Sequence, residues 1–389
     1  MIVDIDRLKQ LLVVALSLGL LLAAVVLTSC QQDNDIEVPA DEPPGRVLLV
    51  YMGGDNNLSA EVYEKTEAIR QGWRNAYDGE LFIYTDPGDA PPKLYRVQGE
   101  GDVAELVVVR SYPEENSASS AVFSRVISEV VHENPAKSYG LLVFSHASGW
   151  LPQQTLIGPR SIIIDGKEEM NLADMAAAIP DGLFDFIVFE ACFMAGIEVA
   201  YELKEKTDYI VASSAEIVSP GFTPVYGKVM EHLFKPKPDL RGVIETVYRH
   251  YNSQAGYRQS ATFSVIHTPA LDALGRWIRE RDVLSSLTQP IDSYDVQHFD
   301  RYTYRLFFDF EDYYSRLLSA ESEQEELSRL VDACVPYRVA TEQFMEGMNG
   351  FPIRKHSGLT TYILQERFPY LNQQYKELRW YREALGDRK

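Results

Sequence analysis

A chain of 389 residues, with 46% hydrophobic and 24% charged side chains, has the ordinary composition of a globular protein. It is long enough for one large domain or two ordinary domains with a real core. The formal net charge of −20 comes from 57 acidic and 37 basic residues. This charge argues against nucleic acid as a partner, because phosphates would be repelled, and it provides no attraction to an anionic membrane surface.

The N-terminus has the pattern of an export signal. Arg7 and Lys9 precede an apolar run, Leu11–Leu27, which is followed by small residues and Cys30. The final Leu-Thr-Ser-Cys resembles the lipobox of bacterial lipoproteins, which implies that residues 1–29 are removed and that Cys30 is lipidated. The resemblance places the protein in the bacterial cell envelope, lipid-anchored at the outer membrane or cell surface. A plain membrane anchor with an incidental cysteine stays open, because a run of this length could span a bilayer.

Residues 30–44 are predicted to be an acidic tether, because this stretch contains acidic residues and proline but no aromatic side chain. Beyond it the chain has two further cysteines, Cys192 and Cys334. In an oxidising compartment these two could form a disulfide on count alone. A free Cys192, kept despite the risk of oxidation, is instead typical of a nucleophile.

Between residues 45 and 268 apolar strands alternate with amphipathic helices. Buried strands are predicted at 46–52, 80–84, 139–144, 161–165, 184–189, 208–213 and 261–267. Helices are predicted at 60–73, 118–132, 171–179, 194–203, 224–234 and 240–254, the first capped by Asn57 or Ser59. Residues 93–97 and 104–110 have the pattern of a hairpin. This alternation predicts an α/β fold, with a mainly parallel central sheet and helices on both faces.

Residues 269–389 are predicted to form a mostly helical C-terminal region that packs on this core. Helical patterns lie at 270–287, 309–318, 324–335 and 371–385, and a further strand is predicted at 359–364. The segment 302–314 is rich in aromatic side chains, which favours packing against the core over a binding role. Cys334 lies in one of these helices and is interpreted as a packing residue.

The stretch around Cys192 carries the strongest indication of chemistry. Residues 184–189 form an apolar strand and Met194–Leu203 the helix after it, so Cys192 lies at the switch between them. In a parallel sheet this is the carboxyl edge, where α/β proteins place ligands and reacting groups. We expect the first turn of the helix to favour the thiolate. A buried structural cysteine is the commoner role of a lone cysteine and stays open.

His146 is the one histidine of seven that follows a buried strand and begins a turn of small residues. The sequence has no zinc-site spacing, no G-x-S-x-G elbow and no P-loop, so no metal site is predicted and Ser145 and Ser148 lack the context of a nucleophile. Neighbouring parallel strands lie about 5 Å apart. His146 and Cys192 can therefore face one substrate as a Cys/His pair.

Several motifs together resemble the clostripain family of cysteine peptidases. They are VLLVYMGGDNNLS at the first strand, FSHASGW, FEACFMAGIEVAYEL, FFDFEDYYSRL and SGLTTYI, and the resemblance extends from about Val47 to the end of the chain. It implies the caspase-like (caspase-hemoglobinase) α/β sandwich and the activity of a cysteine endopeptidase, a hydrolase. The same resemblance implies protein or peptide substrates. The chain is expected to be monomeric and to contact the membrane through the lipid anchor at Cys30.

Carried over residue by residue, the resemblance makes Cys192 the nucleophile and His146 its partner, which helps to activate the thiol and protonates the leaving amine. The oxyanion hole would be formed by the backbone N–H groups of Cys192 and Ala147. The family usually has Gly at the latter position, so a positive φ at Ala147 would cost about 1 kcal/mol. Glu190 stands where the family has an Asp in its specificity pocket, which implies cleavage after Arg or Lys, and Glu216 is the next acidic candidate.

The resemblance also implies an inactive single chain that is cut after a basic residue a short way past the histidine. Arg160, in an irregular stretch with Gly and Pro, is the predicted processing site, and Lys167 is the second candidate. No cofactor is predicted. Calcium activation stays open by resemblance, although the sequence contains no binding motif for it.

Two other functions stay open. The departures at Ala147 and Glu190 would fit a catalytically silent, lipid-anchored binding protein with the same fold. Retention of both Cys192 and His146 favours the enzyme. A cysteine enzyme that transfers acyl groups to an amine would use the same pair.

Overall fold

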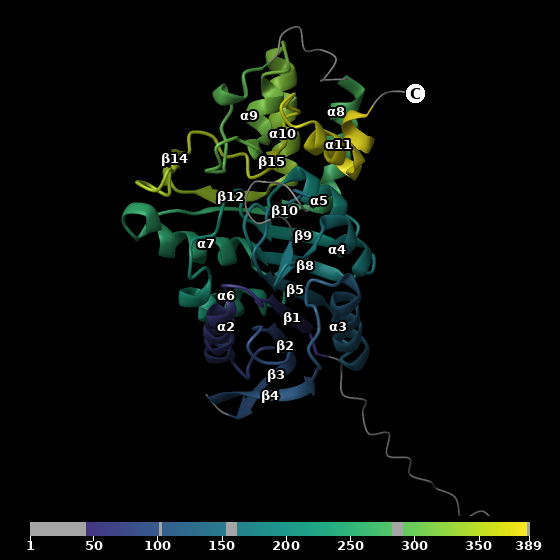
Figure 1. The fold of residues 1–389 in the computed structure, drawn as a ribbon, viewed down its shortest axis with the longest axis vertical. Coiled ribbons are helices and arrows are strands. Elements are labelled where there is room, and N and C mark those ends of the chain that lie inside the picture. The colour runs from purple at the N-terminus through teal and green to yellow at the C-terminus, as the bar shows by residue number, and fades with distance from the viewer. Residues whose placement is uncertain (1–43, 101–102, 153–161, 282–290, 387–389) are drawn as a thin grey trace, which may run out of the picture. The chain divides into compact units, whose positions relative to one another are not determined.

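The computed structural model describes residues 44–100, 103–152, 162–281 and 291–386 (Figure 1). The predicted signal peptide 1–29, the lipidation site Cys30, nearly all of the tether 30–44 and the processing site Arg160 lie outside the described residues, so these stay predictions. Across the described ranges, no helix is both long enough and apolar enough to cross a membrane.

A nine-stranded sheet forms the centre of the described chain, with strand order β12-β10-β9-β8-β5-β1-β2-β3-β4 (Figure 1). Its middle is the parallel block of β9 (Thr207–Ala212), β8 (Phe184–Glu190), β5 (Tyr139–Phe144), β1 (Arg46–Gly53) and β2 (Gly79–Asp86). All five were predicted from their apolar runs. These runs are buried because helices cover the sheet on both sides, as parallel sheets require.

Antiparallel strands flank the parallel block. On one side β3 (Lys93–Glu100) and β4 (Val103–Ser111) form the predicted hairpin beside β2. On the other side β10 (Thr262–His267), predicted in the same style as the parallel strands, runs antiparallel to β9. Two helices on one face of the sheet lie between β9 and β10, so the chain runs along the sheet and back and begins β10 at the end where β9 finished. Strand β10 is therefore an antiparallel member of a sheet that was predicted to be mainly parallel.

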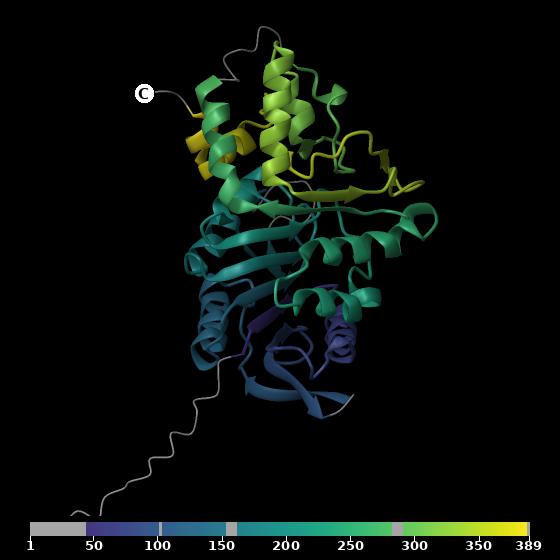
Figure 2. The ribbon, with the colours of Figure 1, turned by 180° about the vertical axis from the view of Figure 1, so that it is seen from behind.

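Helices cover both faces of the sheet, as Figures 1 and 2 show. One face carries α2 (Ser59–Gly72), α6 (Tyr226–Leu233) and α7 (Leu240–Asn252), and the other α3 (Ser120–Glu133), α4 (Leu172–Ala178) and α5 (Ile197–Leu203). Because alternate residues of a strand point to opposite faces, the buried side chains form two clusters. In β1, Leu48 and Val50 belong to one cluster, and Leu49 and Tyr51 to the other.

The C-terminal region shares this core. Its helices α8 (Leu271–Arg281), α9 (Phe310–Ser315), α10 (Glu321–Cys334) and α11 (Pro369–Glu377) gather beyond the β12 edge in both views (Figures 1 and 2). Strand β12 (Tyr337–Ala340) comes from this region and pairs with β10, and Trp380 is in the same hydrophobic cluster as Leu141 of β5. The boundary predicted after residue 268 therefore does not separate two cores.

The aromatic segment 302–314 packs mainly in the core, as predicted. Phe308 and Phe310 are fully buried, and β11 (Phe308–Asp309) pairs with β15 (Thr360–Thr361), which is much shorter than the strand predicted there. The strand predicted at 161–165 is a short one, β6 (Ile163–Asp165), which pairs with β7 (Glu168–Met170) outside the main sheet. Cys334, at the end of α10, is fully buried, which confirms its packing role.

Candidate active site

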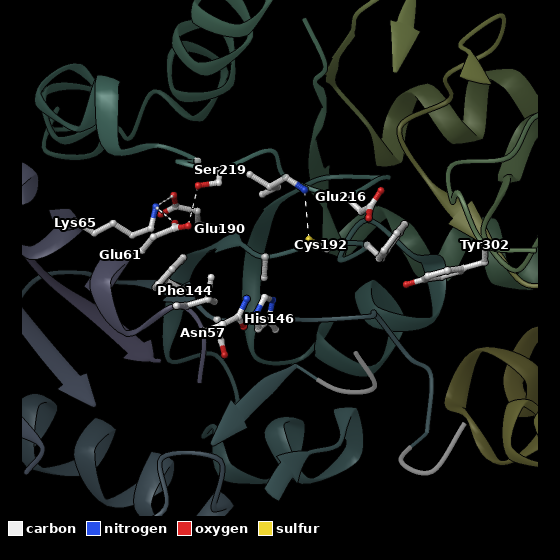
Figure 3. A pocket seen from close by; sticks show the side chains of 16 residues that line it. Asn57, Glu61, Lys65, Phe144, His146, Glu190, Cys192, Glu216, Ser219 and Tyr302 are labelled. Carbon is white, nitrogen blue, oxygen red and sulfur yellow. Dashed lines mark hydrogen bonds and ion pairs between the residues drawn. The ribbon is translucent and has the colours of Figure 1, made fainter. Parts of the chain in front are cut away.

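The pairing register of two central strands brings His146 and Cys192 together. The parallel strands β5 and β8 pair with Phe144 opposite Glu190, so the histidine and the cysteine lie at matching positions just past the strand ends. Both line one cavity of about 360 Å³, and Figure 3 shows their side chains next to each other in it. The predicted residues Glu190 and Glu216 line the same cavity. The structure thus brings four predicted side chains into one site.

The helix after Cys192 begins later than predicted. Helix α5 starts at Ile197, whereas the apolar pattern of the sequence predicts its start at Met194. The residues between are held by backbone hydrogen bonds to the loop after β9, for example from Phe193 N–H to the carbonyl of Ala215 at 3.0 Å. The expected stabilisation of the thiolate by a helix N-terminus is therefore wrong, because that effect is confined to the first turn.

Burial disfavours the charged forms of both Cys192 and His146. Burial raises the pKa of the Cys192 thiol to about 12, opposed in part by the hydrogen bond from the Ile217 amide. That amide lies 3.3 Å from Sγ, and no hydrogen bond between the described atoms joins Sγ to His146. Burial also lowers the pKa of His146 from its ordinary value of 6.5.

Asn57 contacts the ring of His146. Its Oδ1 lies 2.7 Å from Nε2 of the histidine, and both side chains line the cavity (Figure 3). The sequence predicts Asn57 as a helix cap, but α2 has Leu58 at that position and no capping side chain. Asn56 instead accepts the Leu58 amide at 2.9 Å and shapes the turn. Asn57 follows β1 and therefore lies at the same sheet edge as the two catalytic candidates. This position in the sequence could have identified it as a site residue.

Glu190 lies in the cavity lining, but its carboxylate already has partners. Lys65 Nζ lies 2.5 Å from Oε1, the Phe222 amide donates to the same oxygen at 2.5 Å, and the Tyr226 hydroxyl donates to Oε2. The side chains of Lys65 and Glu190 are 0% and 1% exposed. The structure corrects the expectation of a free acidic wall for a substrate's Arg or Lys, because a lysine of the chain itself is bound there. The local sequence around Lys65 contains no pattern that predicts this contact.

Glu216 also has a cationic partner. Arg301 donates to both of its carboxylate oxygens, from Nε at 2.6 Å and from a terminal nitrogen at 2.8 Å. Tyr302, the next residue, lines the cavity (Figure 3), although the aromatic segment that contains it was predicted to serve packing alone. The acidic candidates named from the sequence are therefore in the site, and both are paired.

The family model described as the clostripain family matches residues 50–367 of this chain. The chain belongs to the clostripain family. Clostripain from Hathewaya histolytica is 23% identical over 221 residues, which cover 48% of this chain and 41% of clostripain. An inactive zymogen C11 protease from Parabacteroides distasonis is 32% identical and superposes with a TM-score of 0.77, over 88% of this chain and 99% of that chain. A secreted C11 cysteine protease from Bacteroides thetaiotaomicron, solved with an irreversible peptide inhibitor, is 25% identical, with a TM-score of 0.78 and the same coverage of 88% and 99%.

These similarities confirm the predicted caspase-like α/β fold. They also confirm the predicted membership of a family of cysteine endopeptidases, which are hydrolases. The chain matches less than half of the length of clostripain itself, so the activity of that whole protein is not carried over directly.

In a clostripain-family peptidase of this sequence, the amides of Ala147 and Cys192 would form the oxyanion hole. Neither amide donates a hydrogen bond to another backbone group in the described residues. The positive φ expected at Ala147 is not found: the left-handed residues here are Gly149, with φ 61°, and Phe193, with φ 60°. A Cβ at Gly149 would lie 2.6 Å from the carbonyl oxygen of Phe193. The loop therefore requires glycine at position 149 and not at position 147.

Cys192 and Cys334 are both free thiols, so the disulfide that their count allowed is not formed. Calcium activation was left open by resemblance. In the part of the chain that the structure describes, no group of three or more His, Cys, Asp or Glu side chains is arranged to hold a metal ion.

Proposed function

We propose that this clostripain-family chain is an active endopeptidase in which Cys192 is the nucleophile and His146 its acid–base partner. The observation that carries the proposal is the register of β5 and β8, which sets both side chains in one cavity at the carboxyl edge of the sheet. Asn57 holds the histidine ring, and the cavity is large enough to admit a side chain of a peptide substrate.

The reaction begins when the thiol of Cys192 transfers its proton to the neutral ring of His146. The thiolate attacks the carbonyl carbon of the peptide bond, and the developing oxyanion accepts hydrogen bonds from the amides of Ala147 and Cys192. The C–N bond then breaks, the imidazolium gives its proton to the leaving amine, and a thioester remains. Water loses a proton to His146, attacks the thioester, and releases the carboxylic acid and the thiol.

The proposal includes a lipid anchor at Cys30 in the bacterial cell envelope and activation by cleavage after Arg160. The lipobox resemblance supports the anchor, and the similarity to an inactive zymogen C11 protease supports activation by processing. Cleavage of substrates after Arg or Lys was predicted from Glu190 and Glu216. The contacts of these two residues do not support it, because Lys65 and Arg301 already neutralise them.

Peptide cleavage by the purified protein tests this proposal. Wild type should cleave fluorogenic peptides, Cys192→Ala should abolish cleavage, and His146→Ala should nearly do so, with unchanged circular dichroism. Cys334→Ala, at a buried position remote from the cavity, is the matched cysteine control and should keep the activity. Activity that survives in Cys192→Ala would refute the mechanism.

The alternative is a catalytically silent, lipid-anchored binding protein with the same fold. The observation in its favour is the high pKa of the Cys192 thiol, near 12, together with a histidine that contacts Asn57 instead of the sulfur. Correctly folded wild type that binds peptides and cleaves none of them would favour this alternative.

A further inference from the structure

Lys65 is bound at one end of the catalytic cavity. It lies on the buried side of α2, and its ammonium reaches Glu190 at the end of β8. Figure 3 shows this pair, with Glu61 and Ser219, to one side of His146 and Cys192 in the same cavity. A substrate side chain that enters the cavity beside Cys192 therefore meets this pair or the residues that cover it.

The ammonium of Lys65 has no donor left for a substrate. Its three hydrogens match three acceptors: Glu190 Oε1 at 2.5 Å, the Pro220 carbonyl at 2.8 Å and the Thr223 hydroxyl at 3.1 Å. The nitrogen also lies 4.5 Å from the centre of the Phe144 ring, within cation–π distance. Lys65 therefore does not offer a positive charge to an acidic substrate.

The carboxylate of Glu190 also has three donors from within the chain. Oε1 accepts from Lys65 and from the Phe222 amide, and Oε2 accepts from the Tyr226 hydroxyl. The loop that supplies these donors closes over the pair: a Cβ on Gly221, whose φ is +62°, would lie 2.2 Å from Glu190 Oε1 and 3.1 Å from Lys65 Nζ. A basic side chain from outside could reach this carboxylate only by displacing both the lysine and the loop.

The other carboxylates of the cavity also have partners. Glu216 is held by Arg301 through two hydrogen bonds. Glu61 accepts from the Ser219 hydroxyl at 2.8 Å, and its second oxygen lies 3.6 Å from the ammonium of Lys65. Three acidic side chains thus face two cations, and each of them is engaged. The two cations therefore neutralise most of the negative charge that would otherwise attract a basic substrate side chain.

We propose that Lys65 sets the selectivity of the cleft: its ammonium takes the place of a substrate's basic side chain beside Glu190, so that the enzyme selects neutral side chains before the cleaved bond. This inference rests on the proposed endopeptidase function and specifies its substrates. Lys65 acts through Glu190 and the covering loop, so it is a positioning residue for specificity. A lysine that only stabilised the fold would leave charge selectivity unchanged when removed.

The test compares two peptides that differ only in the residue before the cleaved bond, arginine in one and citrulline in the other. Citrulline has nearly the shape of arginine but no charge, so the ratio of their kcat/KM values isolates the charge. For the full-length wild type the ratio should stay within about threefold of one. In Lys65→Ala the freed Glu190 can accept the guanidinium, and arginine should be favoured by roughly tenfold or more, as expected for a charge-assisted hydrogen bond.

Three further variants separate charge from stability. Lys65→Ala/Glu190→Gln removes both charges and should return the ratio to about one. Lys65→Arg keeps the cation and should keep the wild-type ratio. Glu64→Ala, on the exposed side of the same helix, is the matched control and should leave both rates unchanged.

A wild type that favours arginine over citrulline by tenfold or more overturns the inference while leaving the endopeptidase proposal intact. A folded Lys65→Ala protein without a gain toward arginine overturns it as well. If Lys65→Ala does not fold, the inference is tested by the arginine-to-citrulline kcat/KM ratio of the wild type and of the double variant. A wild type that cleaves no peptide of any class overturns the proposed function and this inference together.

Discussion

The amide oxygen of Asn57 lies 2.7 Å from Nε2 of His146. The contact joins the turn after β1 to the turn after β5, two neighbouring strands of the parallel block. With Nε2 engaged by this oxygen, the ring can exchange a proton through Nδ1. The turn that follows the first strand therefore takes part in the active site, in addition to starting a helix.

Asn57→Ala should lower kcat/KM by about tenfold, which corresponds to about 1.4 kcal/mol for one lost hydrogen bond. Asn57→Asp should place a carboxylate against the ring and raise the pKa of His146. Since the mechanism needs a neutral ring, the acid limb of the pH–rate profile should then move to higher pH by about one unit. Asn56→Ala, in the same turn, should lower the melting temperature without moving that limb. An unchanged profile in Asn57→Asp would argue against the contact.

The Cys192 thiol should react slowly with iodoacetamide. Its pKa is raised to about 12 by burial, whereas a free cysteine has a pKa of about 8.5, so far less thiolate exists at pH 8. Alkylation should be much slower than that of glutathione and should still rise between pH 8 and pH 10. Peptide mapping by mass spectrometry identifies the labelled cysteine. Fast alkylation that does not change from pH 6 to pH 8 would instead indicate a resting thiolate–imidazolium pair.

Asp86 should make the protein less stable as the pH rises. It is fully buried, and Ser117 and Asp165 are among the side chains next to its carboxylate. Burial and the neighbouring Asp165 raise its pKa from 3.8 to about 7. The folded state thus holds the proton more tightly than the unfolded chain, so the stabilisation is complete below about pH 3.8 and is lost as the pH rises through 7.

At pH 8 the free energy of unfolding of Asp86→Asn should therefore exceed that of the wild type by about 2–4 kcal/mol. At pH 4 the two free energies of unfolding should be nearly equal. Chemical denaturation at the two pH values measures this difference. Asp208→Asn, at an exposed position of β9, controls for the loss of one charge. A difference that does not change with pH would mean that Asp86 is not protonated in the folded protein.

Processing should occur after Arg160 in the wild type and should be absent in Cys192→Ala. N-terminal sequencing of the longer fragment should begin at Ser161. An intramolecular cut beside a neutralised Glu190 would not need the charge of Arg160, so Arg160→Gln should still be processed at the same bond. A wild type that is fully active while it remains one chain would show that processing is not part of the mechanism. If Arg160→Gln is not processed while the wild type is, the charge of the side chain selects the bond.

Cys30→Ser should prevent lipidation and leave unprocessed precursor, because the thiol that carries the lipid is gone. Inhibition of the lipoprotein signal peptidase should have the same effect on the wild type. Mass spectrometry of the mature N-terminus checks both. A mature terminus at any other residue would contradict the lipobox assignment.

The amino-acid sequence by itself determined the parallel block and the two catalytic candidates. The apolar runs of β1, β2, β5, β8 and β9 are local patterns, and a strand buried on both faces has to be continuously apolar. His146 and Cys192 follow two of these strands directly. Neighbouring strands lie about 5 Å apart in every sheet, but it is the structure that shows β5 and β8 to be neighbours and in this register.

Tertiary structure alone decided the charge of the cleft and the direction of β10. Lys65 meets Glu190 across 125 residues of chain, and Arg301 meets Glu216 across 85. Such a pair cannot be predicted from the periodicity of the sequence. The residues around each member follow the same pattern whether the side chain faces solvent, a substrate or its partner. The start of α5 was settled in the same way, by backbone bonds such as that from Phe193 to Ala215, which compete with the helix that the local sequence favours.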